Sequence, residues 1–288
     1  MAWRLGVPVV GSWHTNVHEF AARRAARLIG WLPAGVQSAV AHTIERRVLD
    51  AALLFYRIPR ILLAPNAELV ELLERRTGRP TRLMRRGIDA DRFSPAWRTA
   101  DDGVFRLGYV GRLSPEKNLR SLVDVEGALR ARGAPPFRLV IIGDGRERAW
   151  LATHLQRAEF PGILEGDALS RAYANMDLFL FPSTTDTFGN AVLEALASGT
   201  PAIVTPAGGP KTIVEDGVSG IVADAPAGFA DGALSLMRDR GRLERMRAAA
   251  RARALEFSWD RIFEDVYAVY TEALRGRMVG RAARPAVS

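Results

Sequence analysis

The chain alternates short apolar runs with segments of helical periodicity, and this alternation limits the folds that it can adopt. The apolar runs predict strands at 105–110, 137–142, 178–181 and 202–205. Helical patterns follow the first three runs, at about 119–132, 147–156 and 191–197. Strict alternation of strand and helix is typical of a parallel sheet with helices on both faces. We therefore predict an α/β fold.

The first hundred residues show the same alternation less regularly. Strands are predicted at 6–11, in the middle of 51–63 and at 81–85, and helices at 19–32, 37–49 and 66–76. A polar, turn-rich segment at 94–103 then interrupts the periodicity, as a domain linker does. We therefore expect an N-terminal domain over 1–98, a second domain over 99–260, and a C-terminal helix with a basic tail over 261–288.

Composition narrows the classes of function. The 288 residues include no cysteine, which excludes disulfides, cysteine zinc sites and cysteine nucleophiles. No apolar run reaches the length of about 18 residues that a membrane-spanning helix needs. No secretion signal follows Met1, so we expect a cytoplasmic protein.

The formal charge of +8 suits nucleic acid, anionic membranes or phosphorylated small molecules as partners. Solvated, arginine-rich helix faces are the simpler interpretation of this charge. The sequence contains no recognition motif for nucleic acid, so no nucleic-acid partner is expected.

The loop after the strand at 105–110 is a candidate site. Ligands of open parallel sheets bind beyond the carboxyl ends of the strands. This loop contains Gly111, Arg112 and Lys117. Glycine allows close approach to the backbone, and the two cations are able to hold two oxygens of a diphosphate. A solvated surface loop is the alternative, and the spacing alone does not decide between the two.

The loop after the strand at 178–181 carries two acids. Asp186 lies in the loop, and Gly189 and Asn190 lead into a helix that includes Glu194. Free N–H groups and the dipole at a helix N-terminus favour oxygen-rich or anionic ligands, and both carboxylates are able to face one crevice. In the alternative, Asp186 only caps the helix and Glu194 is a solvated helix residue.

Two further strand ends give weaker signals. Gly143 and Gly145 follow the strand at 137–142, but they complete neither G-x-G-x-x-G nor a P-loop, so a tight turn is the simpler interpretation. His14 follows an N-terminal strand. A lone histidine is more often structural, and its place at a strand end favours a functional role only modestly.

Together these motifs resemble the retaining glycosyltransferases of family 4, which have the GT-B fold of two Rossmann-like domains with parallel sheets. The family signature is Glu, seven residues and Glu after a Pro-Ser strand end, and here it extends from Asp186 to Glu194. The Gly-Arg-x-x-x-x-Lys loop matches at Gly111, Arg112 and Lys117. Further matches are Gly-Gly-Pro at 208–210, Glu-Asp-Gly-x-x-Gly at 215–220 and Arg-Gly-Ile-Asp-x-x-x-Phe at 86–93.

The resemblance covers most of residues 7–275 and implies roles for these positions. Arg112 and Lys117 would hold the diphosphate of a nucleotide sugar and neutralise the leaving group, so neither a metal nor another cofactor is expected. Glu194 would bind the ribose hydroxyls, and His14 would lie near the donor sugar and the acceptor. The donor sugar would be held by Asp186 and by the backbone of Phe188, Gly189 and Asn190, with Gly111 beside the diphosphate.

The implied activity is transfer of a sugar from GDP-mannose or a UDP-sugar to a lipid or glycan acceptor. Configuration at the anomeric carbon would be retained by front-face attack, which the leaving phosphate assists. Residues 99–260 would bind the nucleotide sugar. Asp186 stands where the family has Glu, which moves the carboxylate by roughly 1.5 Å. Mannosyltransferase-like members of the family are similar in having Asp at this position, and this similarity mildly favours GDP-mannose as the donor.

The resemblance also predicts an incomplete N-terminal domain. Family members begin with a full Rossmann-like domain, whereas this chain begins at what resembles the later half of that domain. Roughly 100 residues are therefore expected to be absent, and an inactive fragment that only binds nucleotide sugar is the alternative to an active enzyme.

We disfavour an epimerase because no matching acid–base set is found. A basic nucleic-acid binder would lose DNA binding steeply with salt.

Peripheral contact with the inner face of the membrane is a further expectation. The predicted helix at 19–32 combines Arg23, Arg24 and Arg27 with apolar side chains. Such a helix is able to lie on an anionic bilayer, where lipid acceptors reside. A helix with its apolar face in the protein core is the alternative.

Overall fold

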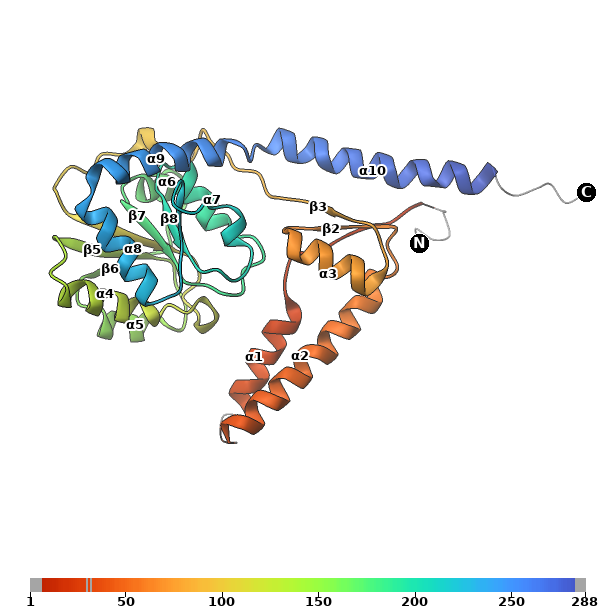
Figure 1. Cartoon of the computed structure of the whole chain (residues 1–288), viewed down its shortest axis with the longest axis horizontal. Coiled ribbons are helices and arrows are strands. Elements are labelled where there is room, and N and C mark those ends of the chain that lie inside the picture. The colour runs from red at the N-terminus through yellow and green to blue at the C-terminus, as the bar shows by residue number, and fades with distance from the viewer. Residues whose placement is uncertain (1–6, 30, 32, 283–288) are drawn as a thin grey trace, which may run out of the picture. The chain divides into compact units, whose positions relative to one another are not determined.

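The computed structural model describes residues 7–29, 31 and 33–282 (Figure 1). Contacts divide the chain into two compact units. The smaller unit comprises the described residues of Met1–Arg86 and Asp260–Ser288, and the larger unit is Gly87–Trp259. Each unit has its own parallel sheet, as the alternation of strands and helices predicts.

The larger unit is built on a six-stranded sheet whose neighbouring strands are all parallel. β7 and β8 are buried along their whole length, which is typical of strands covered on both faces. Across the sheet the order is β6 (Ala158–Gly162), β5 (Phe137–Ile142), β4 (Phe105–Val110), β7 (Leu178–Phe181), β8 (Ala202–Val204) and β9 (Gly220–Val222).

Helices connect these strands and pack on the sheet (Figure 1). They are α4 (Ser121–Ala131), α5 (Arg148–His154), α6 (Gly166–Ala174), α7 (Asn190–Ala197), α8 (Ala227–Arg238) and α9 (Arg240–Leu255), with short 3-10 helices at Pro95–Trp97, Pro115–Lys117 and Pro210–Thr212. In α4 the buried apolar side chains are Leu122, Val125 and Leu129. Spacings of three and four residues place them on one helix face, which contributes to the core.

The smaller unit has a three-stranded sheet in the order β1 (Val10–Ser12), β2 (Ile61–Ala64), β3 (Thr81–Leu83). Its helices are α1 (Val17–Leu28), α2 (Ala34–Tyr56), α3 (Ala67–Thr77) and α10 (Trp259–Ala282) from Asp260 onward. Alternate residues of β2 face opposite sides of the sheet. Leu62 and Ala64 pack with α2 and α3, whereas Ile61 and Leu63 pack with Val269 of α10.

Most of the predicted elements are confirmed, and one is wrong. The strands expected at 105–110 and 137–142 coincide with β4 and β5, and Asn66 caps α3 by accepting the N–H of Leu69 at 2.9 Å. The strand expected in the middle of 51–63 is absent there, because α2 continues to Tyr56 and β2 begins at Ile61. Leu53 and Tyr56 pack into the core at helical spacing, and this packing extends the helix.

The segment 94–103, which was expected to be a linker, lies within the larger unit. The residues just before this segment are held by Arg251 of α9, which donates to the carbonyl oxygens of Ala90 and Phe93 at 3.0 and 2.7 Å. The compact units therefore meet in sequence after Arg86, and most of α10 belongs to the smaller unit. Compact units need not be domains, so the boundaries at 98 and 260 stay predictions.

The helix predicted at 19–32 corresponds to α1, which ends at Leu28. Leu28 and Trp31 are exposed by 76% and 81%. The side chains of Phe20, Arg23 and Arg27, and residue Leu32, lie outside the described part of the chain. Membrane contact through this helix therefore stays a prediction.

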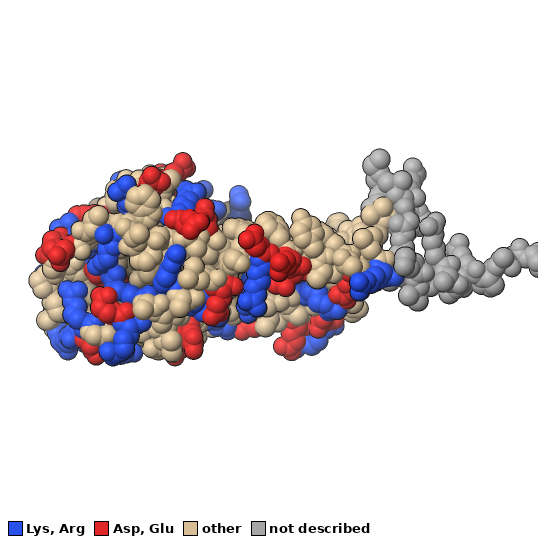
Figure 2. Space-filling view, turned by 90° about the horizontal axis from the view of Figure 1, so that it is seen from above, with Lys and Arg blue, Asp and Glu red and all other residues tan. Residues whose placement is uncertain are grey.

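The hydropathy of the described helices and the charge of the surface also bear on membrane contact. No helix in the described ranges is both long enough and apolar enough to cross a bilayer. On the face shown in Figure 2, basic and acidic side chains are interspersed.

A buried carboxylate ties several elements of the larger unit together. The side chain of Asp177 is 3% exposed. Its Oδ1 accepts hydrogen bonds from the guanidinium groups of Arg98 and Arg247 at 2.6 and 2.7 Å, and its Oδ2 accepts the backbone N–H of Arg106 at 2.7 Å. Asp177 thus joins the segment before β4, the start of β4, the start of β7 and α9 by charge-assisted bonds.

Replacing Asp177 by alanine should therefore destabilise the fold strongly. The change Asp177→Ala leaves two guanidinium groups without their shared carboxylate, and breaking such a buried pair costs about 3–5 kcal/mol. Urea unfolding measures the loss. The matched control is Asp231→Ala, which removes a surface pair with Arg132 that is worth less than about 1 kcal/mol. Similar losses in the two variants would contradict the role given to Asp177.

Candidate active site

The loops that carry most of the predicted site residues meet at the carboxyl ends of the strands of the larger sheet. β4 pairs with β5 on one side and with β7 on the other, so the chain leaves β4 in one direction and later returns on its opposite side. A reversal of strand order of this kind forms a crevice at the carboxyl ends of parallel strands. The loops there contain residues 111–118, 143–145, 182–189 and 205–210.

The loops after β4 and β5 pack backbone against backbone. A Cβ atom on Gly143 would lie 2.0 Å from the carbonyl oxygen of Gly111, and one on Gly145 would lie 2.2 Å from that of Leu113. The N–H of Leu113 donates to the carbonyl of Asp144 at 2.9 Å. The glycines at 143 and 145 therefore form the tight turn expected of them, and they also hold the loop of Gly111 in place.

A second glycine contact fixes the loop of Asp186. The N–H of Gly209 donates to the carbonyl oxygen of Asp186 at 2.7 Å. A Cβ atom on Gly209 would lie 1.9 Å from the carbonyl oxygen of Thr187, and one on Gly208 would lie 2.7 Å from that of Asp186. The Gly-Gly-Pro motif after β8 thus supports the first acid of the signature.

Lys117 and Asp186 form a direct ion pair. The ammonium group lies 2.6 and 2.8 Å from the two carboxylate oxygens. Both side chains are partly buried, with exposed fractions of 20% and 22%. The ammonium group also lies 5.8 Å from the ring centre of Phe181, at the end of β7. The side-chain amide of Asn118 donates to the carbonyl of Pro182 at 3.4 Å, so the loops after β4 and β7 touch at two points.

Tyr109, in β4, contacts the backbone of Arg112. Its buried hydroxyl donates to the carbonyl oxygen of Arg112 at 3.2 Å. Burial raises the pKa of Tyr109, the charges of Asp186 and Glu116 raise it further, and the charge of Arg112 lowers it. The charges of two predicted site residues, Asp186 and Arg112, therefore act on the ionisation of Tyr109. The guanidinium of Arg112 is exposed and forms no ion pair with any residue in the described ranges.

Glu194 is held by a buried tyrosine. The hydroxyl of Tyr173, on α6, donates to Oε2 of Glu194 at 2.8 Å. Burial raises the pKa of Glu194, while the hydrogen bond from Tyr173 and the charge of Arg92 lower it. Burial and the neighbouring carboxylate raise the pKa of Tyr173 well above its ordinary value. Glu194 is thus not the solvated helix residue of the alternative interpretation.

The N-terminus of α7 opens beside Asp186. Gly189 precedes the helix with a φ of 105°, a conformation that favours glycine. Phe188 is buried, with its ring 6.3 Å from that of Phe257. The helix begins at Asn190, and no side chain caps it. The first N–H groups of a helix lack intrahelical acceptors, so this end is suited to an oxygen-rich ligand.

His14 belongs to the smaller unit. It follows Trp13, whose buried indole N–H donates to the side chain of Asn16 at 3.0 Å. Nδ1 of His14 lies 3.4 Å from a guanidinium nitrogen of Arg86. Partial burial lowers the pKa of His14, and the charge of Arg86 lowers it further. A neutral imidazole is therefore favoured at neutral pH.

The structure thus places Arg112, Lys117, Asp186 and Glu194 in the larger unit, around one group of loops. Their roles toward a ligand stay predictions. Motif reasoning missed Tyr173, because the helix that carries it was not predicted. Its signal in the sequence is a tyrosine in an apolar pattern, since a buried hydroxyl needs a hydrogen-bond partner.

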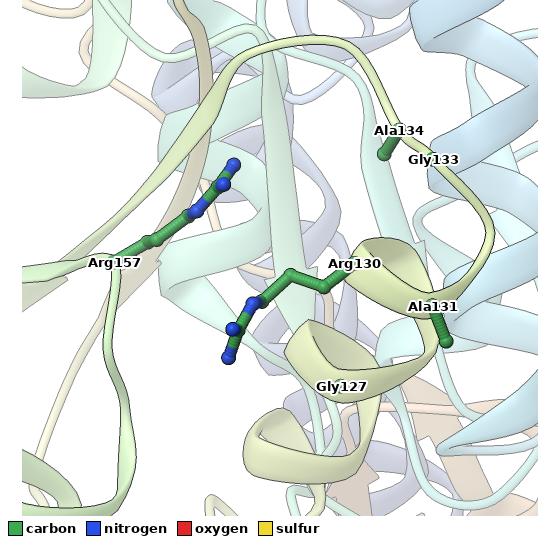
Figure 3. A pocket seen from close by; sticks show the side chains of 6 residues that line it. All are labelled: Gly127, Arg130, Ala131, Gly133, Ala134 and Arg157. Atoms are coloured by element: carbon green, nitrogen blue, oxygen red, sulfur yellow. The ribbon is translucent and has the colours of Figure 1, made fainter.

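A hollow of about 620 Å³ lies elsewhere on the larger unit (Figure 3). Its lining includes Arg130, at the end of α4, and Arg157, just before β6. These positions flank the amino-terminal ends of β5 and β6, opposite the loops described above. Because ligands of parallel sheets bind at the carboxyl ends, we place the candidate site at those loops and not in this hollow.

The glycine contact under Asp186 leads to a stability prediction. In Gly209→Ala the new methyl group meets the backbone of Thr187, which cannot rotate away, so we expect a loss of about 1–3 kcal/mol. The control is Gly127→Ala, on the exposed face of α4 with no atom within 4 Å of the new methyl group. There alanine should stabilise by up to about 1 kcal/mol. Urea unfolding compares them, and equal effects would refute the contact.

The raised pKa of Glu194 predicts a pH-dependent gain on neutralisation. A carboxyl group whose pKa is higher in the folded than in the unfolded state destabilises the fold as pH rises through that pKa. We expect Glu194→Gln to be more stable than the unmodified chain at neutral pH, with the difference shrinking below the ordinary glutamate value of 4.5. Urea unfolding over a pH series measures this. The exposed Glu71→Gln is the control, and a pH-independent difference for residue 194 would count against the prediction.

Comparison with known proteins identifies the family to which the chain belongs. Residues 104–239 match the family model described as glycosyl transferases group 1. The chain is 34% identical over 98% of its length to a GDP-mannose-dependent alpha-mannosyltransferase of Mycobacterium tuberculosis, and covers 71% of that protein. A protein of the same name from Mycolicibacterium smegmatis is 36% identical, with the same two coverages.

Solved structures show the same fold. HepE of Anabaena, in complex with UDP, superposes with a TM-score of 0.69 at 19% identity, covering 94% of this chain and 74% of that one. Sucrose-phosphate synthase from Thermosynechococcus elongatus superposes with a TM-score of 0.73 at 19% identity, covering 96% and 71%. The family model, the identity over almost the whole chain and the GT-B arrangement of parallel sheets agree: the chain belongs to the group 1 glycosyl transferases and is a glycosyltransferase.

Proposed function

We propose that this chain transfers a mannosyl group from GDP-mannose to a lipid or glycan acceptor, with retention of anomeric configuration and without a metal. The contact between Lys117 and Asp186 carries the proposal, because the cation that we assign to the diphosphate and the carboxylate that we assign to the sugar lie together at the carboxyl ends of β4 and β7. The names of the two mycobacterial relatives support GDP-mannose over a UDP-sugar as the donor.

In this proposal the loop after β4 binds the diphosphate. Arg112 offers a planar fork of donors to phosphate oxygens, and Lys117 offers a compact charge. As the glycosidic bond breaks, negative charge develops on the leaving phosphate, and both cations stabilise it. The exposed position of Arg112 and the partial exposure of Lys117 leave each within reach of a ligand in the crevice.

The loop and helix after β7 bind the two ends of the donor. Glu194, oriented by Tyr173, accepts hydrogen bonds from the ribose hydroxyls. Asp186 and the uncapped N–H groups at the start of α7 bind the hydroxyls of the mannose. Retention follows when the acceptor attacks from the face that the diphosphate leaves. We assign His14, in the smaller unit, to the region of the sugar and acceptor, as the resemblance to family 4 implies.

Donor binding tests the proposal directly. We expect calorimetry to show binding of GDP more strongly than UDP. Lys117→Ala and Glu194→Ala should each weaken GDP binding roughly tenfold to a hundredfold, because each removes a hydrogen bond to a charged group. Arg130→Ala, in the hollow of Figure 3, is the matched control and should leave binding unchanged. Loss of binding in Arg130→Ala alone would move the site to the hollow.

Transfer is a separate measurement. Purified chain is incubated with GDP-mannose and with lipid or glycan acceptors, and the anomeric configuration of the product is read by NMR. An inverted product would refute retention. Binding of GDP-mannose without transfer to any acceptor would refute catalysis by this chain and leave a donor-binding protein.

A further inference from the structure

The ion pair between Lys117 and Asp186 occupies the place that the proposed function gives to the donor. The carboxylate presents both oxygens to one ammonium group, at 2.6 and 2.8 Å. Its backbone is fixed, since the carbonyl of Asp186 accepts the N–H of Gly209 at 2.7 Å. Asp186 is therefore a counter-ion for the cation that binds phosphate in the proposed function.

A diphosphate must compete with this carboxylate. An ammonium group has three donors, and Asp186 already takes two of them through its two oxygens. A phosphate that approaches Lys117 meets the negative charge of Asp186, and like charges at one site oppose binding. The positions of Gly208 and Gly209 against residues 186 and 187 limit how far the loop can retreat.

A sugar attached to the diphosphate changes this balance. Sugar hydroxyls are donors, and an ionised carboxylate accepts through about four lone-pair positions. With a nucleotide sugar bound, Asp186 exchanges the ammonium group for hydroxyl donors while the phosphate takes over Lys117. With a bare nucleoside diphosphate, no hydroxyl replaces the lost partner, and the carboxylate faces the phosphate across the site.

We propose that Asp186 determines specificity between the two nucleotide states of the reaction, favouring the nucleotide sugar and disfavouring the bare nucleoside diphosphate that remains after transfer. This inference rests on the proposed function. It assigns to Asp186 a role in addition to holding sugar hydroxyls. The residue acts as the removable counter-ion of Lys117, so it hinders rebinding of the spent product.

Asp186→Asn separates the charge of this residue from its shape. The amide keeps the size of the side chain and still offers one acceptor and two donors to a sugar. It no longer neutralises Lys117 or repels a phosphate. We therefore expect Asp186→Asn to bind bare GDP more tightly than the unmodified chain, by roughly tenfold. Binding of GDP-mannose should gain less than that or weaken.

The quantity to measure is the ratio of the dissociation constants of GDP and GDP-mannose, obtained by calorimetry for the unmodified chain and for Asp186→Asn. The same ratio for UDP and UDP-glucose is measured in parallel, in case the chain binds that base. The control is Asp144→Asn, which removes a charge from the neighbouring loop after β5. It should leave the ratio unchanged, because a general change in field acts on both ligands alike.

Tighter binding of GDP by Asp186→Asn together with a lower ratio, and with the ratio of Asp144→Asn unchanged, supports the inference. An unchanged ratio, or GDP binding that is unchanged or weaker, overturns it while leaving donor binding intact. Failure of the unmodified chain and both variants to bind any of the four ligands overturns the proposed function and this inference with it. Thermal unfolding of each variant shows that all of them are folded when these outcomes are compared.

Discussion

Backbone contacts that only glycine permits position the candidate site. Gly143 and Gly145 let the loop after β5 touch the loop after β4, and Gly208 and Gly209 do the same between the loops after β8 and β7. Any side chain at these positions would meet carbonyl oxygens, which cannot rotate out of the way. Lys117 and Asp186 meet because both loops are held at this separation. The chemistry of the site therefore depends on four residues that have no side chains.

Two aspartates, one before and one after β7, show how surroundings distinguish a structural carboxylate from one that the proposed function assigns to a ligand. Asp177 is buried and receives bonds from Arg98, Arg247 and a backbone N–H, so its partners are fixed by the fold. Asp186 has one cationic partner among the described residues, Lys117, and is partly open to solvent. In the proposed function a ligand replaces Lys117 at Asp186, whereas exchange at Asp177 would break three bonds that join segments of the larger unit. The number of partners, more than the charge, distinguishes the two roles.

The sequence predicts those features that local patterns and chain order determine. Apolar runs locate β4 and β5, and the spaced motifs predict which loops meet. Features that depend on contacts between distant segments are not visible in it. The hydrogen bond of Tyr173 to Glu194 spans 21 residues and the pair of Lys117 with Asp186 spans 69. The extension of α2 to Tyr56 likewise depends on tertiary packing, which overrides the strand-like composition of 51–63.

The larger unit is one uninterrupted stretch of chain, Gly87–Trp259, with its own sheet and core, and it contains every loop of the candidate donor site. The smaller unit is assembled from the segments on either side of it. In the proposed function, nucleotide recognition is therefore encoded in one continuous segment of the chain. Under that proposal, substitutions confined to the flanking segments would leave the residues of the candidate donor site unchanged, because none of them lies in those segments.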